Sequence, residues 1–216
     1  MKRGLFLLAT FTLSSALYAQ DALTREQAQD VFAAYNPALL EKAAQDENLN
    51  QFLEDVLAGY LAQRPQDTLE NRYTLIALAR NFENSLAVNA ALTQYKNALI
   101  YSQQGGDVQA AAREHASKIL AEVYPRIWAV SVQVKEELLT QYQKELKADI
   151  TPAQKQGLHA AIKAVQTDLK NLHTRTGEQL TVLTQDALAQ AEAQAVQAQA
   201  AKSLDVKATS QKPRAG

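Results

Sequence analysis

Apolar residues recur every three to four positions along most of this chain, the spacing that gathers them on one face of an α-helix. The longest apolar stripes run through residues 69–99, 112–142 and 158–187. No segment alternates apolar and polar residues with the period of two that is typical of a half-buried β-strand. The pattern predicts an all-α protein with three long helices.

Proline, glycine and capping residues mark the expected helix ends. Asn36-Pro37 and Pro65 divide the region before residue 67 into short helices. Gly105-Gly106 separates the first two long helices, and residues 149–151 separate the second from the third. Short joints make consecutive helices antiparallel. We therefore expect an elongated antiparallel bundle of three long helices, with the short N-terminal helices packed on it.

Two residues are expected to disturb the long helices. Pro125 lies inside the second and should kink or break it near Tyr124. The third has its apolar residues at alternating spacings of four and three, as in a coiled-coil seam, and Gly177 should loosen it locally.

Residues 1–19 are typical of a secretory signal peptide. Lys2 and Arg3 form a charged start, an apolar stretch follows, and Ala19 is a suitable small residue at the cleavage point. The sequence contains no Cys for a lipid anchor, and no later stretch is apolar enough to span a membrane. We expect an exported protein, either periplasmic or secreted.

After the signal peptide, the pattern predicts short helices over residues 20–66 and a long-helix bundle over 67–187. Residues 188–216 are expected to form an Ala/Gln-rich helical extension and a disordered basic tail. The Ala/Gln-rich segment has two interpretations, a docking helix and a solvated extension. Its composition, with little to bury, favours the solvated extension.

The net charge limits the classes of partner. It is −1 for the whole chain and becomes −3 when Lys2 and Arg3 are removed with the signal peptide. An acidic body argues against nucleic-acid binding, which depends on a basic face.

Candidate catalytic and metal-binding patterns are missing from the sequence. The His residues are His115, His159 and His173, and none has the spacing from a carboxylate that di-iron bundles use. His159 and His173 would lie about 21 Å apart on one helix, too far to share a metal. There is no Gly-rich phosphate loop, nucleophile elbow or HExxH sequence. We expect no catalytic residue, metal or cofactor, and hence no enzymatic activity.

The most distinctive local cluster is EVYPRIWAV, residues 122–130. Tyr124, Arg126 and Trp128 are residue types enriched at binding hot spots, so they are the candidate binding residues. The alternative is that the single Trp of the chain fills the space opened by the Pro125 kink. We favour this core role over the binding role.

Two stretches carry a resemblance to a known family. Leu23-Thr24-Arg25-Glu26-Gln27 matches an LTxxQ pattern, and Ile150-Thr151-Pro152-Ala153-Gln154 matches it with Ile in place of Leu. This pattern resembles the Spy/CpxP family of periplasmic chaperones and stress regulators. The resemblance implies an exported helical chaperone. The chain departs from that family in having no Met after the signal peptide and a mildly acidic charge.

Helix capping explains the same residues on physical grounds. Thr24 and Thr151 are good N-caps, and Gln27 and Gln154 stand at the third helical position, where their side chains complete a capping box. A third match, residues 139–143, lies within a predicted helix, where no cap is needed. Capping is the better interpretation.

The functional expectation follows from the shape and the missing chemistry. We expect a non-enzymatic helical-bundle protein that acts through contacts with other proteins, in the manner of a chaperone of the cell envelope. The alternative is a structural or adaptor protein that self-associates as a homo-oligomer. A small-ligand carrier or an enzyme ranks behind both.

Overall fold

The computed structural model describes residues 22–101, 106–174 and 177–210, with side chains to residue 201. These ranges form helices α1 (Arg25–Tyr35), α2 (Pro37–Ala43), α3 (Glu47–Gln63), α4 (Leu69–Tyr101), α5 (Gly106–Glu145), α6 (Pro152–His173) and α7 (Gly177–Ser210). The β pairing described in them is one isolated bridge between Ala22 and Gln66. The predicted all-α fold is confirmed. The predicted signal peptide lies outside the described residues.

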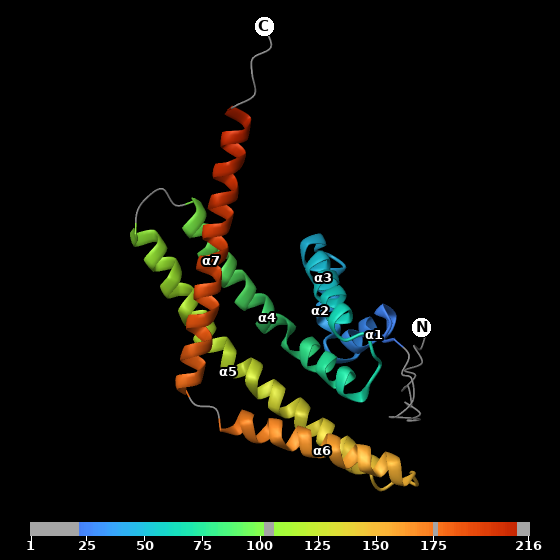
Figure 1. Ribbon diagram of the computed structural model, residues 1–216. Helices are drawn as coiled ribbons and strands as arrows, with labels where there is room; N and C mark the ends of the chain where they lie inside the picture. Colours follow the sequence, from blue (N-terminus) through green and yellow to red (C-terminus); the bar gives the residue numbers. More distant parts are fainter. Residues whose placement is uncertain (1–21, 102–105, 175–176, 211–216) are drawn as a thin grey trace.

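Helices α4 and α5 form an antiparallel hairpin that provides the long axis of the molecule (Figure 1). They contain 33 and 40 residues, which corresponds to roughly 50 and 60 Å. The apolar stripes predicted for these helices supply their buried positions, including Leu75, Phe82, Leu120 and Leu138. Hydrophobic cores form at successive places along the hairpin, each closed by different helices.

The N-terminal core joins α1, α2 and α3 to the first half of α4. Phe82 of α4 is completely buried at its centre. Its ring meets the rings of Phe32 and Phe52 edge-on, with centroid distances of 5.9 and 5.5 Å. The Asn36 side chain caps α2 and also donates a hydrogen bond of 3.1 Å to the Ala79 carbonyl of α4. The short helices are therefore fixed to the hairpin by both packing and hydrogen bonding.

The other two cores lie at opposite ends of α5. Helix α6 packs along the C-terminal half of α5, where Leu158, Val165 and Leu169 meet Leu138 and Tyr142. Helix α7 crosses the hairpin near its closed end (Figure 1). There the core is built from Ala91, Tyr95, Ala116, Leu120, Leu188 and Ala191.

The third long helix of the prediction is two helices in the structure. Helix α6 ends at His173, with Thr174 as its C-cap, and α7 begins at Gly177. Figure 1 shows α7 leaving in a different direction from α6. Thr and Gly have low helix propensity. The two halves also pack into hydrophobic cores at different ends of α5, and one straight helix could not reach both cores.

The buried face of α7 differs from the predicted seam. That seam placed Leu180, Leu183 and Ala187 inward; Ala187 does pack against the core formed with α4 and α5, but Leu183 is 40% exposed. The buried positions are instead Thr184, Leu188, Ala191 and Ala195. Their spacings of four, three and four give an equally regular stripe. Because α7 starts anew after the break, its contacts with α4 and α5 set its orientation independently of α6.

The structure also corrects the interpretation of the Ala/Gln-rich segment as a solvated extension. Leu188, Ala191 and Ala195 are buried, so this segment completes a core of the bundle. Small side chains suit this position because they let helix backbones approach closely. The α7 backbone continues to Ser210 and so includes the start of the expected disordered tail. Residues 211–216 lie outside the described part.

Helix α5 continues through Pro125, so of the expected kink or break, the break does not occur. Proline removes the hydrogen bond to the carbonyl of Ala121, and both Pro125 and Ala121 are exposed, which leaves that carbonyl on the solvent side. Just beyond, the buried Asn81 of α4 donates a hydrogen bond of 3.3 Å to the Ile127 carbonyl. This bond joins α4 to α5 two residues beyond the proline.

Candidate functional site

A polar cluster fastens α7 to the hairpin. The Tyr95 hydroxyl of α4 donates a hydrogen bond of 2.6 Å to Oε1 of Glu192 in α7. Nε of Arg113 in α5 donates to the same oxygen at 3.2 Å, and its Nη2 donates to Oε1 of Gln185 at 3.1 Å. One carboxylate of α7 thus joins both hairpin helices. We call Tyr95, Arg113, Gln185 and Glu192 the α7 clasp.

The clasp shifts the pKa of its titratable side chains, so we expect the docking of α7 to depend on pH. Burial raises the pKa of the Tyr95 hydroxyl to about 12, and the hydrogen bond to Glu192 adds to the rise. That bond in turn lowers the pKa of the Glu192 carboxyl, helped by Arg113. Because its pKa is lowered, the Glu192 carboxylate stabilises the docked α7 at every pH above the ordinary carboxyl pKa. This stabilisation is lost as the pH falls through the lowered pKa.

The three candidate binding residues do not form one surface. Tyr124 is half-buried and packs against the core under α7, and burial raises the pKa of its hydroxyl. Trp128, one helical turn further on, is also half-buried, and its indole nitrogen is covered by protein. Arg126 is exposed and lies on another side of α5, because residues two apart on a helix point in different directions. This arrangement favours the core role of Tyr124 and Trp128.

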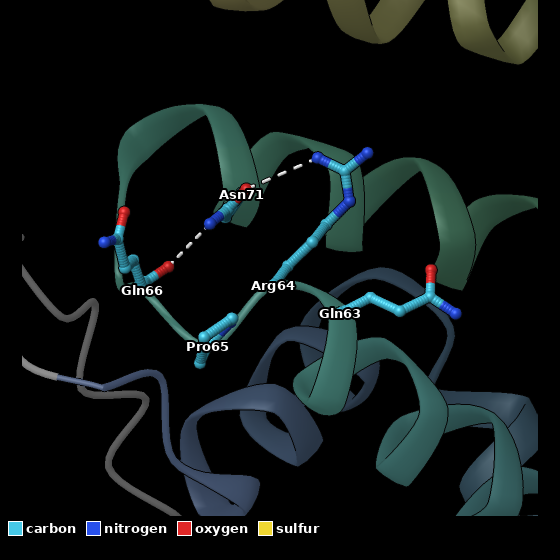
Figure 2. A pocket seen from close by; sticks show the side chains of 5 residues that line it. All are labelled: Gln63, Arg64, Pro65, Gln66 and Asn71. Carbon is cyan, nitrogen blue, oxygen red and sulfur yellow. Dashed lines mark hydrogen bonds between the residues drawn. The ribbon is translucent and has the colours of Figure 1, made fainter.

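Two pockets among the described residues are open depressions of the surface. One, of about 360 Å³, lies at the connection between α3 and α4. Figure 2 shows Arg64 reaching toward Asn71, and Asn71 toward the backbone of Gln66. The two hydrogen bonds measure 3.5 and 2.7 Å. The lining groups already pair with one another, so this depression offers little to a ligand.

The other pocket lies between α4 and α5 and is lined by Tyr73, Gln133, Glu136, Glu137, Thr140 and Gln141. Glu137 is held by Arg80 at 2.8 Å and by Gln133 at 3.1 Å. Glu136 is 3.9 Å from His173 of α6. The carboxylates therefore act as links between helices, and their arrangement does not form an acid–base pair.

Further chemistry is missing from the described ranges. They contain no cluster of His, Cys, Asp or Glu that could hold a metal ion. Within the same ranges, no helix is both long and apolar enough to cross a membrane. His115, His159 and His173 are all exposed.

The two LTxxQ-like stretches form the capping boxes expected from the sequence. Thr24 accepts a hydrogen bond from the backbone N–H of Gln27, whose side chain accepts one from the backbone N–H of Thr24. Thr151 and Gln154 repeat this arrangement at the start of α6. Thr140, in the third match, donates to the Glu136 carbonyl inside α5. The LTxxQ pattern therefore caps the N-terminus of a helix at two of its three occurrences.

Replacing Thr151 by alanine is expected to lower the free energy of unfolding by about 1 kcal/mol, as the loss of an N-cap does. Urea denaturation followed by circular dichroism measures the change. Thr140→Ala is the matched control and is expected to be neutral or slightly stabilising, because Ala is the better helix former at an exposed interior position. Equal losses in the two variants would contradict the capping role, and lost partner binding at unchanged stability would support the family resemblance.

Among the described residues, large apolar side chains are exposed at three places, one of which is Tyr35 at the end of α1. At the start of α7, Val182 is 53% exposed and adjoins Leu183. Near the closed end of the hairpin, Tyr101, Val108 and Val196 are exposed, with Val196 at 65%. The Gln199 side chain, one turn beyond Val196, donates a 2.8 Å hydrogen bond to the Leu99 carbonyl and keeps α7 beside α4 there. We call Val182, Leu183 and Val196 the α7 apolar face; Val182 and Val196 lie about 40° apart around the helix, whereas Leu183 points about 100° from Val182, so the three residues span much of the solvent side of α7.

No protein-family model, curated protein or solved structure matches this chain. The resemblance to the Spy/CpxP family thus rests on the two capping stretches alone.

Sequence reasoning missed the α7 clasp, although the chain contained a signal for it. Glu192 is the single charged residue between positions 187 and 201. A lone charge in an uncharged Ala/Gln-rich helix indicates a specific partner when that helix packs against others. The sequence could not show that the partners were Tyr95 and Arg113, because they lie 97 and 79 residues away.

Proposed function

We propose that this chain is an exported, non-enzymatic helical-bundle protein that acts through contacts with other proteins, in a chaperone-like way in the cell envelope. Export is supported by residues 1–19, whose pattern is typical of a signal peptide. The observation that carries the contact role is the α7 apolar face. It lies on a helix that is held to the bundle by a different set of residues, the buried stripe of Thr184, Leu188, Ala191 and Ala195.

The packing of α7 explains why this face is available. The helix contacts α4 and α5 through Leu188, Ala191 and Ala195, and the clasp fixes it beside them. Val182 and Val196 are 14 residues apart on the same helix, or about 21 Å. An unfolded or extended segment of a client could contact apolar side chains at both positions. Contacts of this kind are separated and small, which suits weak binding to many clients.

Self-association is the second candidate, and the same face favours it. A second copy could cover Val182, Leu183 and Val196, and a two-fold axis would bring identical faces together. This would make the protein a structural or adaptor component of the envelope. The two functions differ in what covers the face, so the same variant serves to test both.

The test is the triple variant Val182→Gln, Leu183→Gln and Val196→Gln. In-envelope crosslinking of the mature protein, followed by mass spectrometry, is expected to capture many unrelated, partly unfolded proteins with the wild type. We expect the variant to capture them at least about tenfold less, since losing roughly 1.4 kcal/mol of contact energy has that effect.

The control carries Gln at three exposed alanines of the same helix, Ala189, Ala193 and Ala200. It should capture clients as well as the wild type. Capture of one or two partners, or of the protein itself, would support the adaptor function. Undiminished client capture by the apolar-face variant would contradict the role of this face.

A further inference from the structure

One exposed flank of α6 carries a continuous basic stripe. Lys155, His159, Lys163, Lys170 and His173 are all exposed and are separated by four, four, seven and three residues. On an α-helix these spacings bring the side chains to one side. The stripe covers 18 residue steps, or about 27 Å. We call these five residues the basic flank.

The lysines of the basic flank are not neutralised by carboxylates. The one carboxylate of α6, Asp168, is bound by Lys135 of α5 at 2.6 Å. Within the described residues, the flank makes an ion-pair contact at its far end, where His173 lies 3.9 Å from Glu136. Lys155, Lys163 and Lys170 have no ion pair within the described residues, whereas many other cations do, namely Arg25, Lys42, Arg72, Arg80, Arg113, Lys118 and Lys135.

The charges of the chain are unevenly distributed between its parts. Residues 25–63, which form α1 to α3, contain two cations and seven carboxylates, a net charge of −5. Residues 152–173 of α6 contain three lysines and one aspartate, a net charge of +2. The acidic helices pack on α4, whereas α6 packs along α5 (Figure 1). The molecule therefore has a basic side despite its acidic total.

We infer that the basic flank binds the surface of an anionic phospholipid bilayer, with α6 lying along the membrane plane. Lys155, Lys163 and Lys170 are spaced by about 12 and 10 Å along a straight axis. A straight line of exposed cations matches a dense plane of mobile phosphates, which needs no shape complementarity. Interactions between exposed charges that lie farther apart than the Debye length of about 8 Å are largely screened. The acidic helices α1 to α3 therefore repel the anionic membrane only weakly. The inference rests on the proposed export, which brings the protein to the envelope membranes.

The experiment uses the mature protein purified after export, with its mass checked for removal of the signal peptide. Its cosedimentation is measured with phosphatidylcholine vesicles containing one third phosphatidylglycerol, and with pure phosphatidylcholine vesicles. Binding to the anionic vesicles alone is expected. The variant Lys155→Gln/Lys163→Gln/Lys170→Gln should bind about 100-fold more weakly, because each lysine near an anionic surface contributes roughly fivefold.

The control variant Lys42→Gln/Lys96→Gln/Lys118→Gln removes the same number of charges outside α6 and should bind nearly as well as the wild type. Arginines at the three α6 positions should preserve binding, and an unchanged melting curve shows that each variant is folded. Equal binding by the α6 glutamine variant and the control would overturn the inference. A salt-sensitive oligomer that depends on the α6 lysines, with no vesicle binding, would assign the flank to a second copy instead. Client capture in the envelope is scored separately, so either proposal can fail alone.

Discussion

Replacing Phe82 by alanine is expected to destabilise the protein by about 3–5 kcal/mol, a large part of the roughly 5–15 kcal/mol that stabilises a typical domain. The side chain is completely buried. Its removal leaves a cavity among α1, α3 and α4 and abolishes both edge-on contacts, with Phe32 and Phe52. In urea, a loss of this size should lower the unfolding midpoint by about 1.5–2 M.

Phe82→Leu separates the volume of the side chain from its aromatic geometry. Leucine keeps most of the apolar contact and loses the ring contacts, which are worth about 0.5–1.5 kcal/mol beyond their area. We expect Phe82→Leu to lower the free energy of unfolding, but by less than Phe82→Ala does. If both variants unfolded at the wild-type midpoint, the N-terminal helices would not be docked on α4 through this residue.

The sequence predicted the helices best where packing and local signals agreed. Asn36-Pro37 ended α1 and started α2 as expected, and Thr151 started α6 with the expected capping box. The stripes of α4 and α5 supplied their buried residues because each helix keeps one orientation along the hairpin. In these regions the residues nearby in the sequence are enough to determine where a helix begins or ends and which of its residues are buried.

Prediction failed where contacts distant in sequence decided the outcome. The break after His173 and the orientation of α7 depend on which end of α5 each helix packs against. A break at Pro125, one of the two expected outcomes, is absent because the carbonyl that the proline leaves free lies on the solvent side. Neither fact can be derived from the spacing of apolar residues.

The candidate binding surfaces, too, could be predicted only in part from the sequence. Tyr124, Arg126 and Trp128 were chosen by residue type, yet two of them face the bundle and one faces away. The spacing of the α6 lysines was readable in the sequence. The pairing of Asp168 with Lys135 was not, because it depends on how α6 packs on α5.

Leu188→Ala tests the docking of α7 and is expected to destabilise it by about 2–5 kcal/mol. Leu188 is completely buried between α4 and α5. Because the cores along the hairpin are separate, the effect should be local to this one. Amide hydrogen exchange in residues 184–195 should accelerate by about 100-fold for a loss of roughly 3 kcal/mol, while the amides of α6 keep their protection.

Leu183→Ala is the matched control, because it removes the same atoms from the same helix at a side chain that is 40% exposed. A change of less than about 0.5 kcal/mol is expected for it. The pair also discriminates between two orientations of α7. A larger loss for Leu183→Ala than for Leu188→Ala would restore the seam of Leu180, Leu183 and Ala187 and would remove the basis for an exposed apolar face. The expected order instead places Leu183 on the surface that is available to a partner.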